Sequence, residues 1–384
     1  MYKETVDFIQ NLYGTKDFLP LHEPRFIGNE KKYVNEAIDS TFVSSVGKYV
    51  TQFEEKLAGY VGAKYAIATS NGTSALHIGL KLVGVDEHSE VITQPLTFIA
   101  TANAIAYCQA QPVFVDVDKD TLGLSAEKLE DFLEKETFIN KKHECINKST
   151  KKVIKACVPM HTFGHPCRIE DIVKVCDKYG ITVVEDAAES LGSYYKGQHT
   201  GTFGKVGVFS FNGNKVITTG GGGMIVTDDE ALAKRAKHIT TTAKVPHPYE
   251  YIHDEVGYNY RLTNLAAALG VAQMESLPLF VEKQRALADK YKDFFEVSSL
   301  DFIVEPKESL SNYWLNAVVL KDREARDVFL KYTNDNGIMT RAIWRLMNKL
   351  EMFKDAQCGD LSNAQWLEDR VVNISSSVIL KEES

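Results

Sequence analysis

Short runs of apolar and β-branched residues alternate with longer segments of helical period over the first two thirds of the chain. Strands are predicted at Tyr65–Ala68, Glu90–Thr93, Pro112–Val115, Lys152–Val158, Ile181–Glu185, Val206–Phe211 and Met224–Thr227. Helices are predicted between them at Ser74–Leu82, Ile99–Tyr107 and Ile169–Tyr179. Strands that alternate with helices predict an α/β fold, in which a mostly parallel sheet is covered on both faces.

The pattern changes towards the C-terminus. A long helical period covers about Leu262 to Phe294, and a second βαβ-like unit follows at Tyr313–Leu320, Arg323–Thr333 and Ile338–Arg341. We therefore predict a large domain over residues 1–262 and a smaller C-terminal α/β domain over residues 263–384. The polar, lysine-rich segment 140–152 is predicted to be a solvated surface loop, with a basic patch for phosphate as the alternative.

Composition limits the function classes. The 384 residues carry a net charge of −8, which argues against a general nucleic-acid binder, because such proteins need a basic face. The N-terminus has no apolar signal core, and we expect no stretch long enough to cross a bilayer, so the chain is expected to be cytoplasmic. The six cysteines contain no C-x-x-C pair and are expected to be reduced thiols.

Two strand ends carry reactive side chains. Asp186 follows the apolar run Val183–Glu185, and ligands of parallel α/β sheets bind at the carboxyl ends of strands. The alternative is that Asp186 only caps a helix. Lys215 follows the strand Val206–Phe211 and precedes four glycines, Gly220–Gly223, which allow close backbone packing. A nicotinamide site would instead need G-x-G-x-x-G between a strand and a helix.

A third strand end resembles an anion site. The strand Tyr65–Ala68 turns through Asn71 and Gly72 into a helix, whose first turn offers free N–H groups and the hydroxyls of Thr73 and Ser74. A plain capped helix start is the alternative. A lysine, a carboxylate and an anion cradle at strand ends of one sheet are the groups that pyridoxal 5′-phosphate (PLP) needs.

The chain resembles the DegT/DnrJ/EryC1/StrS sugar aminotransferases, which have the aspartate-aminotransferase-like fold (fold type I) with a large PLP domain. The resemblance covers nearly the whole chain. It is carried by the blocks Phe42–Glu55, Ser70–His77, Val184–Ser190, Phe209–Lys215, Gly220–Met224 and Gly257–Asn264. Within the family the chain is most similar to the legionaminic-acid-pathway branch, which uses a UDP-linked 4-keto-6-deoxy N-acetylated sugar.

The resemblance implies a role for each matching position. Lys215 would bind PLP covalently as a Schiff base and shuttle protons, and Asp186 would pair with the pyridine nitrogen. The remaining cofactor contacts would be Glu189 near the ring oxygen, where relatives often have Gln or His, Phe98 stacked on the ring, and Gly72, Thr73 and Ser210 on the phosphate.

Asn259 would reach the phosphate of the partner subunit's cofactor, which implies a homodimer with shared active sites. Arg261 is a candidate for substrate contacts. L-glutamate would be the amino donor and a nucleotide-linked keto sugar the acceptor.

Two positions depart from the relatives. Ala342 and Ser375 stand where they often have proline, which puts the shape of the sugar pocket in doubt.

Two further groups allow more than one interpretation. Cys157, His161, His165 and Cys167 resemble zinc ligands, but the prolines and glycine among them favour a turn beside the active site, where His161 is a candidate substrate contact. Trp344 lies beside Arg341 and Arg345 and is either a packing residue or a platform for a diphosphate-linked base.

Two other PLP-dependent functions are the alternatives. A sugar dehydratase of this type would have histidine in place of Lys215. A non-catalytic PLP-binding regulatory protein would normally need an attached module, and the chain has no spare length for one.

Overall fold

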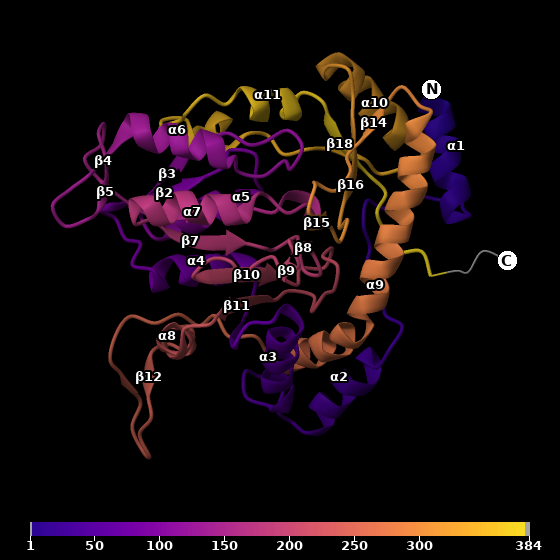
Figure 1. The fold of residues 1–384 in the computed structure, drawn as a ribbon. Helices are drawn as coiled ribbons and strands as arrows, with labels where there is room; N and C mark the ends of the chain where they lie inside the picture. Colours follow the sequence, from indigo (N-terminus) through magenta and orange to yellow (C-terminus); the bar gives the residue numbers. More distant parts are fainter. Residues whose placement is uncertain (1, 381–384) are drawn as a thin grey trace.

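The computed structural model describes residues 2–380 and is built around a nine-stranded mixed sheet (Figure 1). Seven strands follow one another in the order β1-β11-β10-β7-β6-β2-β3, and β5 and then β4 attach to one side of β6. Their bounds are β1 Tyr65–Thr69, β2 Ser89–Thr93, β3 Gln111–Phe114, β4 Thr137–Ile139, β5 Cys145–Asn147, β6 Val153–Val158, β7 Thr182–Asp186, β10 Val206–Ser210 and β11 Gly223–Thr227. The pairs from β10 through to β3 are parallel, as the alternating pattern predicts.

The edge of the sheet nearest the reactive lysine is antiparallel. Strand β11 pairs antiparallel with both β10 and β1. Because β10 and β11 are joined only by the loop that contains Lys215 and the four glycines, the chain reverses direction there without a crossover helix. This loop therefore lies at the carboxyl end of β10, beside the end of β7.

Helices cover both faces of the sheet. On one face α4 (Gly72–Leu82), α5 (Ile99–Tyr107) and α8 (Glu230–Thr240) pack on inward side chains such as Val184 and Val208. On the other face α3 (Lys48–Val61) and α9 (Asn264–Glu296) cover one half, and α6 (Ala126–Glu136) and α7 (Ile169–Tyr179) cover the other. Helix α2 (Glu30–Asp39) lies beside α9. Neighbouring strand residues, such as Val183 and Val184, belong to cores on opposite faces, as strand geometry requires.

The lysine-rich segment differs in part from its prediction as a loop. Residues 140–144 and 148–152 are turns, but β5 between them pairs with β4 and β6. Cys145, Ile146 and Asn147 are buried, because this short strand extends the main sheet and contributes Cys145 to its core.

A second, antiparallel sheet forms near the C-terminus in the order β14-β16-β18-β17. Its strands are β14 Asp301–Phe302, β16 Asn316–Val319, β17 Arg341–Ala342 and β18 Val371–Ile374, and α10 (Arg323–Asp335) connects β16 to β17. Strands β16 and β17 both pair antiparallel with β18, so they run in the same direction, as in the predicted βαβ-like unit. Helix α11 (Ser362–Glu368) precedes β18.

The N-terminus packs with this C-terminal sheet. Val6 and Ile9 of α1 (Tyr2–Tyr13) share a core with Tyr291 of α9 and Phe329 of α10, and α1 lies beside the upper part of α9 (Figure 1). The division of the chain at residue 262 stays a prediction.

The smaller elements complete the fold. A three-stranded sheet consists of β8 (Tyr194–Tyr195), β9 (Gln198–His199) and β15 (Ser309–Leu310), and a hairpin of β12 (Lys244–Val245) and β13 (Ile252–His253) extends away from the body (Figure 1).

Helix α9 corrects one expectation. Its 33 residues include a stretch that is long and apolar enough, by length and composition, to cross a membrane. The expectation that no such stretch exists was therefore wrong. However, most of that stretch is buried inside the protein, as in the core helix of a globular fold. Pro278 lies inside α9, which bends along its length (Figure 1).

Candidate active site

Lys215 lies in the loop after β10 and turns its amine into the protein. Its backbone N–H donates to the Asn212 carbonyl at 3.0 Å, which folds the loop back on itself. Its side chain is only 13% exposed, and Nζ lies 3.3 Å from Oε1 of Glu189. The same amine lies over the ring of Trp314, 3.8 Å from its centroid. A lysine after a strand is usually solvated, so this burial makes Lys215 a candidate site residue.

Asp186 ends β7, the strand next to β10, and is fully buried. Its Oδ2 accepts a hydrogen bond from the Thr101 hydroxyl at 2.7 Å, and its Oδ1 accepts one from the Ala188 N–H at 3.2 Å. Burial raises the pKa of Asp186, whereas the two hydrogen bonds and the Lys215 cation oppose that shift. An ionised carboxylate held in this way can stabilise a protonated ring nitrogen.

Glu189 connects the lysine to the wall of the site. Its Oε2 accepts the Phe163 N–H at 2.9 Å while Oε1 faces Lys215. Burial raises the pKa of Glu189 to about 7, although the Lys215 cation lowers it. The Asn312 side chain donates to the backbone carbonyl of Glu189 and accepts the backbone N–H of Trp314, so it ties the backbones of these two residues together.

The expected anion cradle lies where α4 begins. The Asn71 side chain accepts the Ser74 N–H at 2.7 Å and caps the helix. A Cβ at Gly72 would come 2.9 Å from Cβ of Ser210, and a Cβ at Gly223 would come 2.4 Å from the Asn71 carbonyl. The glycines thus allow the N-terminus of α4 to approach the end of β10, where free N–H groups and hydroxyls suit a phosphate.

The donor set fits PLP. A buried primary amine, a buried carboxylate and a helix N-terminus lie at the ends of β10, β7 and β1, in one sheet edge. Phe98 precedes α5, the helix that carries Thr101, and half of its side chain is exposed, so a ring face is free for stacking.

Three further positions were expected to contact the substrate or the partner's cofactor: His161, Asn259 and Arg261. The ring of His161 is fully buried: Nε2 donates to Glu185 at 3.0 Å, and Nδ1 accepts the Cys167 N–H at 3.2 Å. Both ring nitrogens thus have partners within the protein, and the role of His161 as a substrate contact stays a prediction. Asn259 is exposed, and Arg261 pairs through its backbone with Thr69 at the end of β1. Their roles stay predictions.

The four zinc-like residues do not form a group with metal-ligand spacing within residues 2–380. Cys167 Sγ lies 3.6 Å from His161, but both ring nitrogens of His165 are buried without a partner, and the ring packs edge-on against Tyr313.

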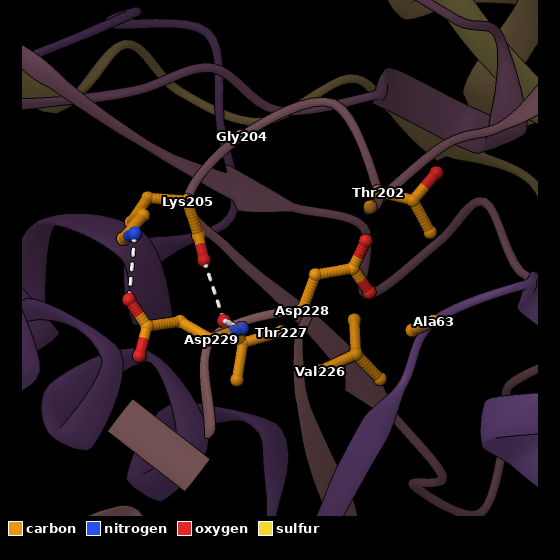
Figure 2. Close-up of a pocket in the computed structure, with 9 residues that line it drawn as sticks. Ala63, Thr202, Gly204, Lys205, Val226, Thr227, Asp228 and Asp229 are labelled. Carbon is orange, nitrogen blue, oxygen red and sulfur yellow. Dashed lines mark hydrogen bonds and ion pairs between the residues drawn. The ribbon is translucent and has the colours of Figure 1, made fainter. Parts of the chain in front are cut away.

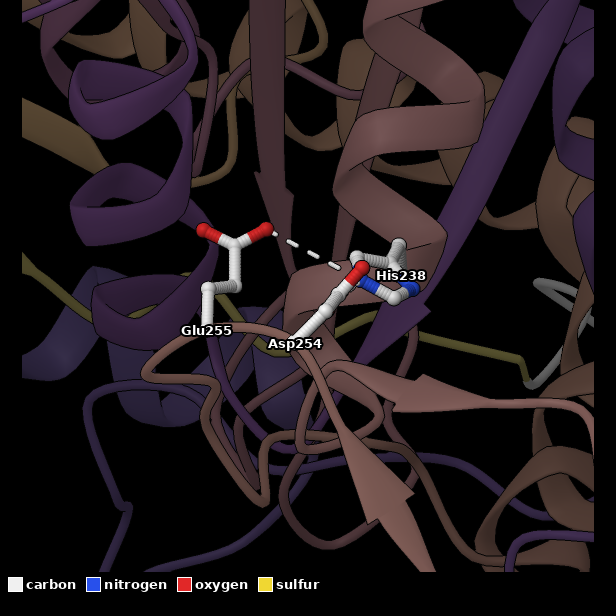
Figure 3. A group of neighbouring side chains, drawn as sticks. All are labelled: His238, Asp254 and Glu255. Carbon is white, nitrogen blue, oxygen red and sulfur yellow. Dashed lines mark hydrogen bonds and ion pairs between the residues drawn. The ribbon is translucent and has the colours of Figure 1, made fainter.

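Within residues 2–380 a different group has metal-ligand spacing: His238, Asp254 and Glu255 (Figure 3). His238 lies 2.7 Å from Asp254, and both oxygens of Glu255 already bind Arg235. These contacts connect α8, which carries Arg235 and His238, to the segment after β13, which carries Asp254 and Glu255.

A pocket of about 250 Å³ lies where β10 begins and β11 ends, at the opposite ends of these strands from the loop that carries Lys215. Its lining comes from the segment before β10, from the end of β11 and the residues after it, and from Ala63 (Figure 2). An ion pair of 2.7 Å joins Lys205 to Asp229 there. It is therefore separate from the candidate active site.

Sequence reasoning missed Thr101 and Phe163, and it placed Trp314 only within the strand predicted at Tyr313–Leu320. Trp314 is buried, and its indole N–H donates to the Asn214 carbonyl at 2.7 Å, but its ring also lies under Lys215. No local signal identifies these residues, because they meet Asp186, Glu189 and Lys215 only through tertiary contacts.

Comparison with known proteins agrees with this geometry. The sequence profile of the DegT/DnrJ/EryC1/StrS aminotransferase family matches residues 24–384. GDP-perosamine synthase of Escherichia coli O157:H7 is 39% identical over 88% of this chain and 88% of its own. The putative pyridoxal phosphate-dependent aminotransferase EpsN of Bacillus subtilis (strain 168) is 39% identical over 88% of this chain and 84% of its own.

Solved structures show the same fold. The aminotransferase TlmJ from Streptoalloteichus hindustanus superposes with a TM-score of 0.84 at 26% identity, over 93% of both chains. DesI, crystallised in the presence of its TDP-sugar product, has a TM-score of 0.82 at 25% identity, over 96% of this chain and 91% of its own. The chain belongs to the DegT/DnrJ/EryC1/StrS aminotransferase family and is a PLP-dependent aminotransferase of fold type I.

Proposed function

We propose that the chain transfers an amino group from L-glutamate to the 4-keto group of a nucleotide-linked 4-keto-6-deoxy sugar, for surface-polysaccharide or nonulosonic-acid biosynthesis. A nucleotide-linked sugar is supported by the relatives, of which three are named GDP-perosamine synthases and one was crystallised with a TDP-sugar. The observation that carries the proposal is the amine of Lys215, buried beside Glu189 at the end of β10, next to the strand that ends in Asp186.

PLP, when bound, supplies an electron sink that lets an amino-acid carbon lose a proton. Lys215 then holds and returns that proton as a general base and acid, which requires its uncharged amine. The Asp186 carboxylate would pair with the ring nitrogen and keep a proton on it, and Thr101 holds that carboxylate in place. Glu189 lies close enough to accept or return a proton at the Lys215 amine.

The finer parts of the proposal are the nucleotide and the assembly. Resemblance favours a UDP-linked, N-acetylated sugar, whereas several relatives have GDP in their names. We propose a cytoplasmic homodimer as the working unit, in which Asn259 reaches the partner's cofactor phosphate and Arg261 assists in binding substrate. The exposure of Asn259 is compatible with contact to another subunit.

Two other PLP-dependent functions are the alternatives to amino transfer. A sugar dehydratase is disfavoured by Lys215 itself, because such relatives have histidine there. A non-catalytic regulator is included, since one relative, 32% identical over 82% of this chain, is named pleiotropic regulatory protein in Geobacillus stearothermophilus.

The test has two stages. Purified protein with PLP should show a violet absorbance band that borohydride abolishes, and L-glutamate should shift this band reversibly. The second stage measures amino transfer to UDP-, GDP- and dTDP-linked 4-keto-6-deoxy sugars. Lys215→Ala should eliminate transfer while the circular dichroism spectrum is unchanged. Full activity of this variant, or a band indifferent to every amino acid, would refute the proposal.

A further inference from the structure

Two arginines differ from all the others in having no partner for their guanidinium group among the described residues. Of the ten arginines in the chain, eight bind a carboxylate, an amide or a carbonyl within residues 2–380. The other two are Arg261, beside the anion cradle, and Arg345, which is exposed. Arg341, the neighbouring candidate, is paired with Asn334 and with the Thr340 carbonyl. A guanidinium left free beside an active site is available to an anionic ligand.

Arg345 follows Trp344 in the sequence. The ring of Trp344 contacts two aromatic residues that are themselves connected to the site, Phe163 and Phe98. The Trp344 ring lies 5.1 Å from the ring of Phe163 and 6.5 Å from that of Phe98. The Phe163 N–H binds Glu189, the partner of Lys215, and Phe98 starts the helix whose Thr101 binds Asp186. Trp344 therefore forms the next part of the wall outward from the reacting groups.

The indole of Trp344 is not fully used by packing. The side chain is only partly buried, and its N–H has no acceptor among the described residues. By contrast, the buried Trp314 donates its N–H to the Asn214 carbonyl. Buried indoles usually find such a partner, so the free N–H and open ring of Trp344 are available to a bound molecule.

The backbone around Trp344 and Arg345 is rigidly held. The Ile343 N–H donates to the Val371 carbonyl at 3.0 Å, and the Leu346 N–H donates to the Glu368 carboxylate at 3.1 Å. The Met347 N–H donates to the Pro95 carbonyl at 2.9 Å, which ties the segment to the loop that carries Phe98. A binding segment held in this way loses little conformational entropy when ligand arrives.

We propose that Trp344 and Arg345 form the acceptor-binding wall, with Trp344 against the sugar ring and Arg345 on the diphosphate of a nucleoside-diphosphate sugar. This inference rests on the proposed function and names the residues that would select its acceptor. The diphosphate must lie farther from Lys215 than the keto carbon does, and Arg345, the residue after Trp344, is exposed to solvent. A guanidinium binds phosphate oxygens in pairs, and an indole offers a flat apolar face to a sugar ring.

The first experiment measures the binding of UDP, GDP and dTDP to the PLP-loaded enzyme by isothermal titration calorimetry. Arg345→Gln should raise the Kd of the tightest of the three by about tenfold or more, because it removes a charged donor from the diphosphate. The matched control is Arg323→Gln, an exposed arginine on α10 in the same part of the chain, and it should leave the Kd unchanged. An unchanged Kd in Arg345→Gln, or no binding of any of the three, would overturn the inference.

The second experiment separates acceptor binding from chemistry. Trp344→Leu should raise KM for the keto sugar, while the rate at which L-glutamate shifts the cofactor band stays that of the parent enzyme. Trp366→Leu, which changes another partly buried tryptophan that packs on Lys119 and Arg370, should alter neither value. Equal KM values for Trp344→Leu and the parent enzyme would contradict a role for the indole. Failure of the parent enzyme to react with L-glutamate would instead refute the proposed function.

Discussion

Glu189→Gln provides a quantitative test of the site's electrostatics. A glutamate carboxyl group ordinarily has a pKa of 4.5, and burial raises the pKa of Glu189 to about 7 in the folded protein. Between these two values the folded protein keeps a proton that the unfolded chain releases, so stability falls as the pH rises. At about 1.4 kcal/mol per pKa unit, the free energy of unfolding falls by about 3 kcal/mol as the pH rises from 4.5 to 7. Above pH 7 this decrease is complete. Glutamine has the same shape and does not titrate.

The assay is urea unfolding of the PLP-free protein at about pH 5 and about pH 8, on either side of the raised pKa. Glu189→Gln should reduce the decrease in unfolding free energy over this range by about 2 to 3 kcal/mol relative to the parent protein, slightly less than the full loss because pH 5 already lies above the ordinary pKa. Lys215→Met serves as a control, because it removes the cation that lowers the pKa of Glu189 and should make the decrease larger. An identical pH dependence in the parent protein and Glu189→Gln would show that Glu189 keeps an ordinary pKa and would refute the reasoning.

Three further variants test the rest of the site. Asp186→Asn should slow the L-glutamate half-reaction by several orders of magnitude through loss of ring protonation, as measured by stopped-flow absorbance; an unchanged rate would show that another group supplies the charge. Thr101→Val removes the 2.7 Å hydrogen bond to Asp186 and should weaken PLP binding, measured by equilibrium titration, by about tenfold, whereas equal affinity would mean that the bond is dispensable. Gly72→Ala places a Cβ 2.9 Å from Cβ of Ser210 and should also lower PLP affinity, with Gly59→Ala, where a Cβ meets nothing within 4 Å, as the control; equal losses in the two would remove the cradle from consideration.

The sequence predicted most elements near the active site because their patterns are local. The strands that end near Asp186 and Ser210, and the helices that begin near Gly72 and Ile99, appear within a residue or two of their expected positions. The roles of Lys215 and Asp186 in binding PLP stay predictions for these residues, although the structure brings their side chains within electrostatic reach of each other.

Strand direction was harder to predict. Nothing in the short run Met224–Thr227 shows that β11 pairs antiparallel with β10 and β1, since a buried strand is apolar in either direction. The strand β5 inside the lysine-rich segment was missed for a related reason: its three buried residues are flanked by polar turns and acquire their environment only from β4 and β6.

The sequence by itself determined most of the strands of the main sheet, the chemical types at their ends and the family of the chain. Only the tertiary structure decided which side chains meet. It placed Thr101 on Asp186, 85 positions apart, and Trp314 under Lys215, and it turned His161 towards Glu185. The physical reason is that hydrophobic periodicity reports which face of an element is buried, whereas a hydrogen bond between buried groups depends on how separate elements pack.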